Sequence, residues 1–409
     1  MSIPRADILA IFRGALAAVH GTACVERFLA VRSRWGEVHA VAVGKAAAAM
    51  LEGARGTLGE RLHRALLITK PDHVPLGVKD IPAIAVIEAG HPVPDAASLR
   101  AGQALLDFIA ATPREAQLLF LISGGTSSLV EVLPQGVSLD ELRRVNQWLL
   151  GSGLDIRAMN VLRKRLSCIK GGRLAGYLRG RDVLQLLISD VPGDHPADIG
   201  SGMLMPEEEV QMPAVALPSW LLALLKDSPP RMTDPSWFLH IETRLVATLD
   251  EALAAAASET RKLGYELEVH RERLSGDAAL AGRWLAGSLI DAPPGVHIWG
   301  GETSVPLPSE PGRGGRNQHL ALAAAEVLAG RKDVWLLAAG TDGGDGAGQD
   351  AGALVDGATI LRGTIKHMNA ADCLRRADAG SFLEKSGDLI RTGPTGTNVM
   401  DMVIGLKAP

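Results

Sequence analysis

Short apolar runs alternate with helical patterns along most of this 409-residue chain. The runs Val38–Val43, Leu118–Ile122 and Val183–Ile188 are brief and nearly all apolar, which is typical of strands buried on both faces. Such strands occur in parallel sheets that are covered by helices on both sides. The pattern therefore predicts an α/β fold with glycine-rich turns where the strands end.

The same periodicities predict further elements in both halves of the chain. A capping box, Ser138–Glu141, marks the start of one helix. A helix is also expected to begin at once after Val43, with Lys45 in its first turn, and another ends near Phe108. The remaining predictions are helices at about 5–35, 138–180, 250–263, 276–290 and 317–329, and strands at about 65–69, 83–88, 244–249, 265–270, 296–305, 334–339 and 401–405.

A proline-rich stretch separates the two halves of the chain. Six prolines lie between residues 206 and 235, and the segment Lys226–Arg231 is polar and proline-containing. Such composition is typical of an exposed linker between domains. We therefore expect two domains, 1–235 and 236–409.

Composition narrows the class of protein. Apolar residues make up 47% of the chain but aromatic residues only 4%, and there are 46 glycines, which favours helices packed closely through small side chains. The net charge of −4 gives no reason to expect nucleic acid or an anionic membrane as a partner. Cys24, Cys168 and Cys373 lack metal-ligand spacing, so free thiols are expected. With no signal peptide or transmembrane run, a soluble cytoplasmic protein is expected.

The first glycine-rich turn follows the strand Val38–Val43. Gly44 and Lys45 lead directly into an alanine-rich segment, so Lys45 is expected in the first turn of a helix. A lysine there opposes the helix dipole at a cost of a few tenths of a kcal/mol. Either an anionic ligand offsets this cost, or Lys45 is an ordinary solvated side chain.

The turn after Leu118–Ile122 is made of small and hydroxyl-bearing residues. Two adjacent glycines leave room for a ligand to approach the main chain, so its N–H groups could cradle an anion. A plain β-turn with a Ser/Thr cap is the other interpretation. The turn comprises Ser123, Gly124, Gly125, Thr126, Ser127 and Ser128.

Two further features of the first half could contact a substrate. Arg163, Lys170 and Arg173 belong to a basic cluster, which is either a solvated helix face or a site for a carboxylate or phosphate. Asp190 follows the strand Val183–Ile188, where open α/β sheets bind ligands. Asp190 could accept a proton from a hydroxyl or bind Mg²⁺. The other interpretation, an Asx-turn or a helix cap, fits Asp194 better than Asp190.

Glycine-rich turns recur in the second half, each beside a charged residue. With Lys45 and Asp190 they supply backbone donors, two strong cations and several carboxylates able to hold Mg²⁺, the groups that phosphoryl transfer uses. No Walker A motif and no G-x-S-x-G nucleophile elbow is present. The first strand is also not followed by a G-x-G-x-x-G fingerprint, which weighs against a standard dinucleotide-binding dehydrogenase. The charged residues are Glu302 after Gly300 and Gly301, Arg316 after Gly314 and Gly315, and Asp342 and Asp345 after the strand at 334–339.

Seven motifs, taken in order along nearly the whole chain, resemble those of the class II glycerate kinase family, whose C-terminal half is a MOFRL domain. The resemblance implies a larger Rossmann-like N-terminal domain, a smaller α/β C-terminal domain and an active site in the cleft between them. The motifs are Val43–Ala47, Ile122–Leu129, Asn160–Ala175, Ile188–Asp194, Gly300–Val305, Gly314–Gln318 and Ala339–Gly346.

The resemblance also implies an activity: ATP- and Mg²⁺-dependent phosphorylation of D-glycerate at the 2-hydroxyl, giving 2-phosphoglycerate and ADP, by a glycerate 2-kinase. Lys45 and Arg316 match the family's essential cations, and Asp190 is the candidate to orient or deprotonate the hydroxyl. Arg163, Lys170 or Arg173 would bind the glycerate carboxylate. ATP phosphates are expected against Gly44, Ser123, Gly124, Gly125, Ser127, Ser128, Gly300, Gly301, Gly314 and Gly315, with Mg²⁺ on some of Asp190, Glu302, Asp342 and Asp345.

The sequence leaves the oligomeric state open between a monomer and a homodimer. Two other functions also remain open at this point. One is an NAD(P)H-dependent hydroxypyruvate reductase, a name often given to members of this family. The other is a nucleotide-binding module without turnover. NADH oxidation with hydroxypyruvate, compared with ADP formation with glycerate, distinguishes the two enzymes.

Overall fold

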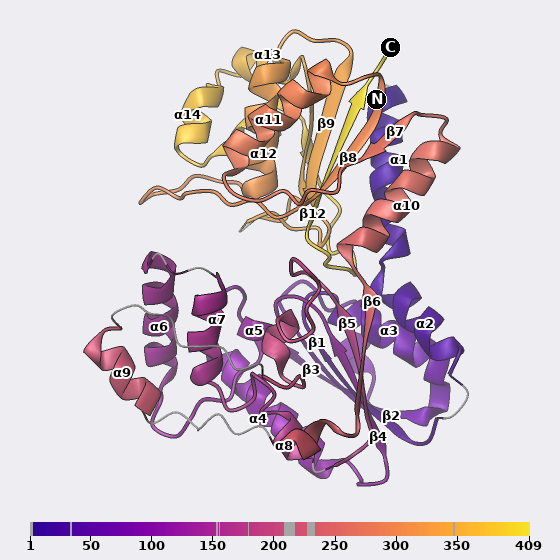
Figure 1. Ribbon diagram of the computed structural model, residues 1–409, viewed down its shortest axis with the longest axis vertical. Coiled ribbons are helices and arrows are strands. Elements are labelled where there is room, and N and C mark those ends of the chain that lie inside the picture. Colours follow the sequence, from indigo (N-terminus) through magenta and orange to yellow (C-terminus); the bar gives the residue numbers. More distant parts are fainter. Residues whose placement is uncertain are drawn as a thin grey trace. The chain divides into compact units, whose positions relative to one another are not determined.

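The computed structural model of the protein describes residues 3–32, 35–152, 154, 156–178, 180–207, 217–226, 234–346 and 348–409. It divides into two compact units, Gly21–Val246 and Met1–His20 with Ala247–Pro409, which we call the N-unit and the C-unit (Figure 1). Much of the expected linker, residues 208–216 and 227–233, lies outside the described residues. Within the described part of the linker, Ser219–Lys226 forms helix α9.

The N-unit contains a six-stranded sheet in the order β3-β2-β1-β4-β5-β6. Its strands are β1 (Val38–Val43), β2 (Leu62–Thr69), β3 (Ile84–Glu88), β4 (Gln117–Ile122), β5 (Val183–Ile188) and β6 (Ile241–Ala247). The pairs β1–β2, β2–β3, β1–β4 and β4–β5 are parallel. The strand order reverses between β1 and β4, as in doubly wound nucleotide-binding folds, so the expected Rossmann-like architecture is confirmed.

Helices of the N-unit pack closely against each other through small residues. A Cβ added to Gly53 of α3 would lie 2.4 Å from the carbonyl oxygen of Thr22 in α2, so only glycine permits this approach. This agrees with the packing expected from the glycine- and alanine-rich composition. The helices are α2 (Gly21–Ala30), α3 (Ala47–Leu58), α4 (Ala96–Ala111), α5 (Thr126–Leu129), α6 (Leu139–Gly151), α7 (Ile156–Arg165) and α8 (Ala175–Leu178), with 3₁₀ turns η1 (Gly59–Arg61), η2 (Val78–Asp80), η3 (Ile199–Gly202) and η4 (Pro235–Phe238).

Two helix predictions in the first half need correction. The segment at 5–35 forms two helices, α1 and α2, which meet at residues 19–20. The segment at 138–180 forms α6, α7 and α8, with a turn before α8 at Gly171 and Gly172, whose φ angles of 59° and 79° cannot continue a helix. The capping box at Ser138 is confirmed, since its Oγ accepts the backbone N–H of Glu141 at 3.2 Å.

The C-unit contains a second six-stranded sheet, in the order β11-β10-β9-β12-β8-β7. Its strands are β7 (Leu267–Val269), β8 (Gly295–Gly301), β9 (Val334–Gly340), β10 (Gly352–Asp356), β11 (Leu389–Ile390) and β12 (Asp401–Lys407). Strand β12 is antiparallel to both of its neighbours, β8 and β9, while β7 is parallel to β8. The carboxyl ends of β8 and β9 therefore lie at the same edge as the amino end of β12.

Helices cover both faces of the C-unit sheet (Figure 1). On one face α11 and α12 pack so closely that a Cβ on Gly282 would lie 2.2 Å from the Leu320 carbonyl oxygen. On the other face α1 packs against α10. The helices are α1 (Ile3–Ala18), α10 (Leu249–Lys262), α11 (Ala278–Asp291), α12 (Arg316–Leu328), α13 (Thr359–Ile365), α14 (Ala370–Arg375) and α15 (Ala379–Ser386); the sequence patterns did not predict α13–α15, β10 or β11.

The two units differ from the expected domains, 1–235 and 236–409, in two places. Helix α1 belongs to the C-unit, where Ile8, Ile11 and Phe12 are fully buried. Strand β6, which follows the expected boundary, belongs to the N-unit sheet. An amphipathic helix or an apolar strand shows that it will be buried, but its pattern does not say against which sheet.

The structure also shows the state of the three cysteines and which helices could cross a membrane. Cys24, Cys168 and Cys373 are free thiols, as expected. Among the described helices, none alone has the length and apolar composition to cross a membrane, and only one bent pair, Pro4–Ala18 with Gly21–Ala30, meets those two criteria in combination.

Candidate active site

In the N-unit, the turns after β1 and β4 are joined at the point where the strand order reverses. The backbone N–H of Lys45 donates to the Gly124 carbonyl at 2.9 Å, and the N–H of Ala46 donates to Ser123 Oγ at 3.0 Å. Gly44 has a φ of 125°, and a Cβ there would lie 2.3 Å from Ser123 Oγ. Only glycine permits this contact, so the predicted Gly44 and Ser123 turns pack directly against each other.

Lys45 does not lie in the first turn of a helix, as the sequence suggested. Helix α3 begins at Ala47 with Ala46 as its N-cap, so Lys45 precedes the helix. Its side chain is half-buried and runs beside Gly125, where a Cβ would lie 3.2 Å from Lys45 Cγ and 3.1 Å from the His91 ring. The side chain thus follows the surface of the glycine-rich turn, and the neighbouring His91 is a residue that sequence reasoning left aside.

Ser127 and Ser128 lie on the single turn α5. Ser128 Oγ donates to the Gly125 carbonyl at 3.1 Å, and the hydroxyl oxygens of Ser127 and Ser201 are 2.7 Å apart. Ser201 belongs to η3 and has a left-handed backbone with a φ of 60°. The sequence patterns did not single out this segment; its signal was the alternation Gly200-Ser201-Gly202, which resembles an ordinary flexible loop.

Lys170 lies beneath this turn in a buried ion pair. Its Nζ donates to the Ser127 carbonyl at 2.7 Å and to Glu131 Oε2 at 2.5 Å, and the Ser167 hydroxyl donates to Glu131 Oε1 at 2.6 Å. The side chains of Lys170 and Glu131 are 4% and 1% exposed. Lys170, which was predicted as a substrate contact, therefore directs one ammonium proton to the serine turn and another to the Glu131 carboxylate.

The other two basic candidates also have protein partners. Arg173 is buried and donates from NH1 to the carbonyls of Lys164 and Lys170, at 2.7 and 3.0 Å. Arg163 donates from Nε to Asn146 Oδ1 at 3.0 Å, and burial lowers the pKa of its guanidinium. The predicted basic cluster is therefore divided among separate contacts, and Arg163 is the member on the α7 surface that is only half-buried.

Asp190 lies just beyond the carboxyl end of β5, beside β4 in the sheet. It is half-buried, whereas the preceding Ser189 is fully buried. Because β1, β4 and β5 are parallel, Asp190 and the Gly44 and Ser123 turns extend from the same edge of the sheet. This is the edge at which open α/β sheets bind ligands.

In the C-unit, Arg316 is the centre of a cluster of carboxylates. It is the first residue of α12, and its Nε and NH2 donate to the two carboxylate oxygens of Asp401 at 2.5 and 3.0 Å. Its NH1 lies 2.6 Å from Glu302 Oε1. Although burial opposes the charged form, the negative charges of Asp401 and Glu302 raise the pKa of Arg316 above its ordinary value.

Asp401 is a member of this cluster that sequence reasoning missed. It opens β12 and is paired in register with Gly301 of β8 on one side and Gly340 of β9 on the other. Its carboxylate is 7% exposed and forms a bidentate pair with a guanidinium, a strong and directional contact. The sequence showed Asp401 only as the start of a strand, because the antiparallel direction of β12 decides which edge it reaches.

Asp345 caps the helix that begins with Arg316. Its Oδ1 and Oδ2 accept the backbone N–H groups of Asn317 and Gln318 at 3.0 and 2.8 Å. Burial raises the pKa of Asp345 to about 6, with the Asp401 charge acting in the same direction, although the two backbone hydrogen bonds oppose the shift. A Cβ on Gly315 would lie 2.3 Å from Asp345 Oδ1, so this cap requires the predicted glycine.

The remaining predicted residues of the C-unit lie at the same edge. Gly300 and Gly301 end β8, Gly314 precedes the cap, and Asp342 follows β9. Asp342 Oδ1 accepts the backbone N–H of Gly344 at 2.9 Å. A Cβ on Gly340 would lie 3.3 Å from Asp342 and 3.4 Å from Asp401, so these two carboxylates flank the end of β9.

The structure therefore gathers the predicted residues into two groups, one in each unit. The group of the N-unit combines backbone amides, hydroxyls, Lys45 and Asp190. The group of the C-unit combines Arg316 with Glu302, Asp342, Asp345 and Asp401. The group of the N-unit lies at the carboxyl ends of parallel strands, and the group of the C-unit lies at the carboxyl ends of β8 and β9 and the amino end of β12.

Both units of the chain are similar in sequence to known proteins. The family described as "Domain of unknown function (DUF4147)" matches residues 7–222, and the family described as "MOFRL family" matches residues 295–401. A D-glycerate 2-kinase of Thermotoga maritima is 37% identical over 385 residues, which covers 90% of this chain and 89% of the relative. A protein of Agrobacterium vitis, provisionally named a hydroxypyruvate reductase, is 35% identical over 411 residues, covering 96% and 92%.

A solved structure shares the fold of the whole chain. The crystal structure of a glycerate kinase from Thermotoga maritima matches with a TM-score of 0.81 at 33% identity, covering 98% of this chain and 98% of that chain. The similarity therefore includes the N-unit, the C-unit and the strands whose ends carry both groups of residues.

Proposed function

This chain belongs to the glycerate kinase family with DUF4147 and MOFRL segments, and on that premise we propose that it transfers a phosphoryl group from ATP to the 2-hydroxyl of D-glycerate. The products are 2-phosphoglycerate and ADP. The transfer to the 2-hydroxyl, rather than to another hydroxyl of glycerate, is the part of the proposal that rests on the named 2-kinase relative.

The observation that carries the proposal is the turn from Gly44 to Ala46. It lies at the reversal of strand order, where doubly wound folds bind nucleotides, and it is joined to the Ser123 turn by hydrogen bonds. In place of the glycine fingerprint of dinucleotide-binding enzymes it presents a lysine. A fixed backbone with one cation suits a triphosphate, because phosphoryl transfer depends mainly on positioning and charge neutralisation.

We propose that Arg316 neutralises the transferring phosphoryl group together with Lys45. The nearly buried Asp401 carboxylate accepts hydrogen bonds from Nε and NH2 of the Arg316 guanidinium. Glu302 takes NH1 and is 39% exposed, so a ligand can approach Arg316 from that side. Asp401 is then a positioning residue, which keeps the long arginine side chain in one orientation.

Magnesium suits the oxygen-rich ligands of both groups. Mg²⁺ binds carboxylate and water oxygens in octahedral geometry, which Asp190, Glu302 and Asp342 could provide. Asp345 fits less well, because both of its oxygens already accept N–H groups of α12. We propose that Asp345 orients the first turn of α12, and that bound Mg²⁺ would supply charge neutralisation on the phosphates.

Two residues of the N-unit are proposed to act on glycerate. Asp190, at the end of β5, accepts the proton of the 2-hydroxyl as the phosphoryl group arrives. Arg163 binds the glycerate carboxylate, with Arg173 as the second candidate. Lys170 supports them by fixing the turn that carries Ser127.

The test is identification of the product. The full chain is incubated with ATP, Mg²⁺ and D-glycerate, and phosphorus NMR follows the new phosphate ester. Proton coupling to the single hydrogen of C2 is expected for 2-phosphoglycerate, while coupling to a CH₂ group would overturn the assignment to the 2-hydroxyl. If no phosphate ester forms, the proposed kinase activity is wrong.

The name of the Agrobacterium relative is the one observation that favours a second function, an NAD(P)H-dependent hydroxypyruvate reductase. The Gly44 turn lacks the glycine fingerprint of such enzymes, so we expect no NADH or NADPH oxidation with hydroxypyruvate. The same preparation that forms ADP with glycerate provides the positive control.

A further inference from the structure

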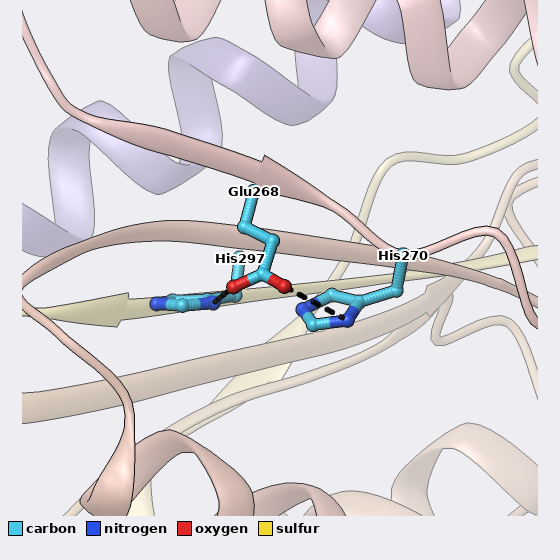
Figure 2. A group of neighbouring side chains, drawn as sticks. All are labelled: Glu268, His270 and His297. Carbon is cyan, nitrogen blue, oxygen red and sulfur yellow. Dashed lines mark ion pairs between the residues drawn. The ribbon is translucent and has the colours of Figure 1, made fainter.

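Glu268, His270 and His297 gather at the edge of the C-unit sheet, apart from the residues assigned to phosphoryl transfer. Glu268 lies on the edge strand β7 and is paired in register with His297 of β8. His270 directly follows β7, and its backbone N–H donates to the Ile298 carbonyl at 2.9 Å. Figure 2 shows the Glu268 carboxylate extending between the two imidazole rings.

The orientation of His297 leaves a lone pair facing this carboxylate. His297 Nε2 lies 3.2 Å from the Pro293 carbonyl oxygen, and since a carbonyl can only accept, Nε2 carries the ring proton. In the neutral imidazole, Nδ1 is then an acceptor, and it lies 3.3 Å from Glu268 Oε2. Two acceptors at this distance need either a proton or a metal cation between them. A carbonyl that holds the far nitrogen of a ligating histidine is a common support of metal sites.

His270 supplies the third donor. Its ring is stacked on Trp299, with centroids 4.3 Å apart and planes within 4°, so a buried neighbour sets its orientation. Its Nδ1 lies 3.8 Å from Glu268 Oε1, and its Nε2 is buried without a hydrogen-bond partner among the described residues. His270 therefore has a nitrogen available on each side of its ring.

The distances suit a small transition-metal ion. Donor atoms of the three residues all lie within 4.8 Å of one another. In a tetrahedral zinc site with bonds of about 2.0–2.1 Å, two donors are about 3.3 Å apart. The pair His297–Glu268 already has this spacing, and His270, which follows a strand of only three residues, needs to move inward by about 1 Å.

We propose that Glu268, His270 and His297 bind one divalent ion of the zinc class, with water as a fourth ligand. Two imidazoles and one carboxylate favour Zn²⁺, Co²⁺ or Ni²⁺ over Mg²⁺, which prefers oxygen ligands alone. The site is thus chemically distinct from the oxygen-rich groups proposed for catalysis, and it does not depend on the proposed function.

The bound ion would clamp the edge strand to the sheet. After His270 the chain continues along β8: the Leu274 N–H donates to the Gly300 carbonyl at 3.0 Å, and the Glu302 N–H donates to the Leu274 carbonyl at 2.9 Å. This segment supports the backbone of Glu302, the partner of Arg316. A metal that joins β7 to β8 therefore stabilises the C-unit next to its candidate catalytic residues.

The experiment uses the full chain, freed of metal with a chelator and kept in excess Mg²⁺. Zinc is titrated by calorimetry, thermal unfolding is followed with and without zinc, and Co²⁺ serves as a visible-absorption probe. We expect one Zn²⁺ per chain, a higher Tm with zinc, and a tetrahedral Co²⁺ spectrum that zinc abolishes. Absence of stoichiometric binding overturns the proposal.

Matched variants locate the ion. Glu268→Gln and His270→Gln change side chains that are 56% and 26% exposed, so the fold should persist. Because even residues that only support a metal ligand contribute 10- to 100-fold in affinity, loss of a ligand should weaken zinc binding by at least about 10-fold. Glu266→Gln and His240→Gln, also exposed, are the controls and should bind zinc as the parent does. Unchanged affinity in both ligand variants places the ion elsewhere and overturns the proposal.

Discussion

The two groups of candidate residues reach the same kind of sheet edge in different ways. In the N-unit the edge is formed mainly by backbone: the N–H groups of Lys45 and Ala46 donate to Gly124 and Ser123, and Gly44 packs against Ser123. In the C-unit it is formed by charge, with Arg316 held among carboxylates. The first arrangement depends on glycines that tolerate close approach, and the second on pairing buried charges. Mutations should therefore affect the two regions differently.

The largest expected effect tests whether both regions serve one step. Lys45→Ala and Arg316→Ala should each lower kcat for glycerate-dependent ADP formation by about 10³-fold or more, as for arginine fingers. If the two cations act as a unit on the same transition state, the double variant should lose much less than the product of the two single losses.

Controls for this comparison are available in each unit's exposed charges. Arg283→Ala in the C-unit and Arg143→Ala in the N-unit remove exposed ion pairs with Glu326 and Asp140 and should leave kcat unchanged. Near-parental kcat in folded Lys45→Ala and Arg316→Ala proteins would contradict the assignment. Fully multiplicative losses would show that the two cations contribute independently of each other.

The second prediction concerns the support of the N-unit edge. Lys170→Met leaves the carboxylate of Glu131 buried without its partner, which should lower the free energy of unfolding by about 3–5 kcal/mol. The double variant Lys170→Met/Glu131→Gln should regain part of this loss, because the uncompensated charge is gone. Urea denaturation followed by tryptophan fluorescence measures both.

Lys79→Met is the matched control for Lys170→Met. Lys79 forms an exposed pair with Glu88 in the same unit, so its removal should change stability by less than about 1 kcal/mol. Equal effects at Lys79 and Lys170 would show that burial of the Lys170–Glu131 pair does not matter, and that the serine turn is held by other contacts.

The third prediction uses the titration of Asp345 in the C-unit. Its folded-state pKa is raised from 3.8 to about 6, so between these values the folded protein binds more protons than the unfolded chain. This contribution to stability is present below about pH 4 and is lost as pH rises through about 6. A shift of this size corresponds to about 3 kcal/mol.

The measurement is the difference in unfolding free energy between the parent and Asp345→Asn at pH 4 to 7. The parent should lose stability relative to the variant as pH rises across this range. Asp333→Asn is the control: its exposed pairing with Arg331 lowers the pKa of Asp333 from 3.8, so its contribution is lost only at lower pH and the difference should stay nearly constant from pH 4 to 7. A difference that does not vary with pH would show that Asp345 keeps an ordinary pKa when folded.

Much of the N-unit edge could be predicted from the sequence, because its chemistry is local. An apolar strand followed at once by Gly44 and Lys45, or by Ser123, Gly124 and Gly125, identifies both the strand end and the turn that follows it. The actual contacts of Lys170 could not be predicted in this way. Its partner Glu131 lies in a different segment, and only folding brings the two side chains into one buried pair.

The sequence by itself determined that the chain is an α/β protein, where most strands lie and which glycine-rich turns follow them. It also placed Arg316 beside Gly314 and Gly315 at the start of a helix. Only the tertiary structure decided that α1 packs on the C-unit, and that Asp401 reaches Arg316 between Gly301 and Gly340. Periodicity reports whether a residue is buried, whereas the partner of a buried charge depends on strand order and direction, which neighbouring residues along the chain do not encode.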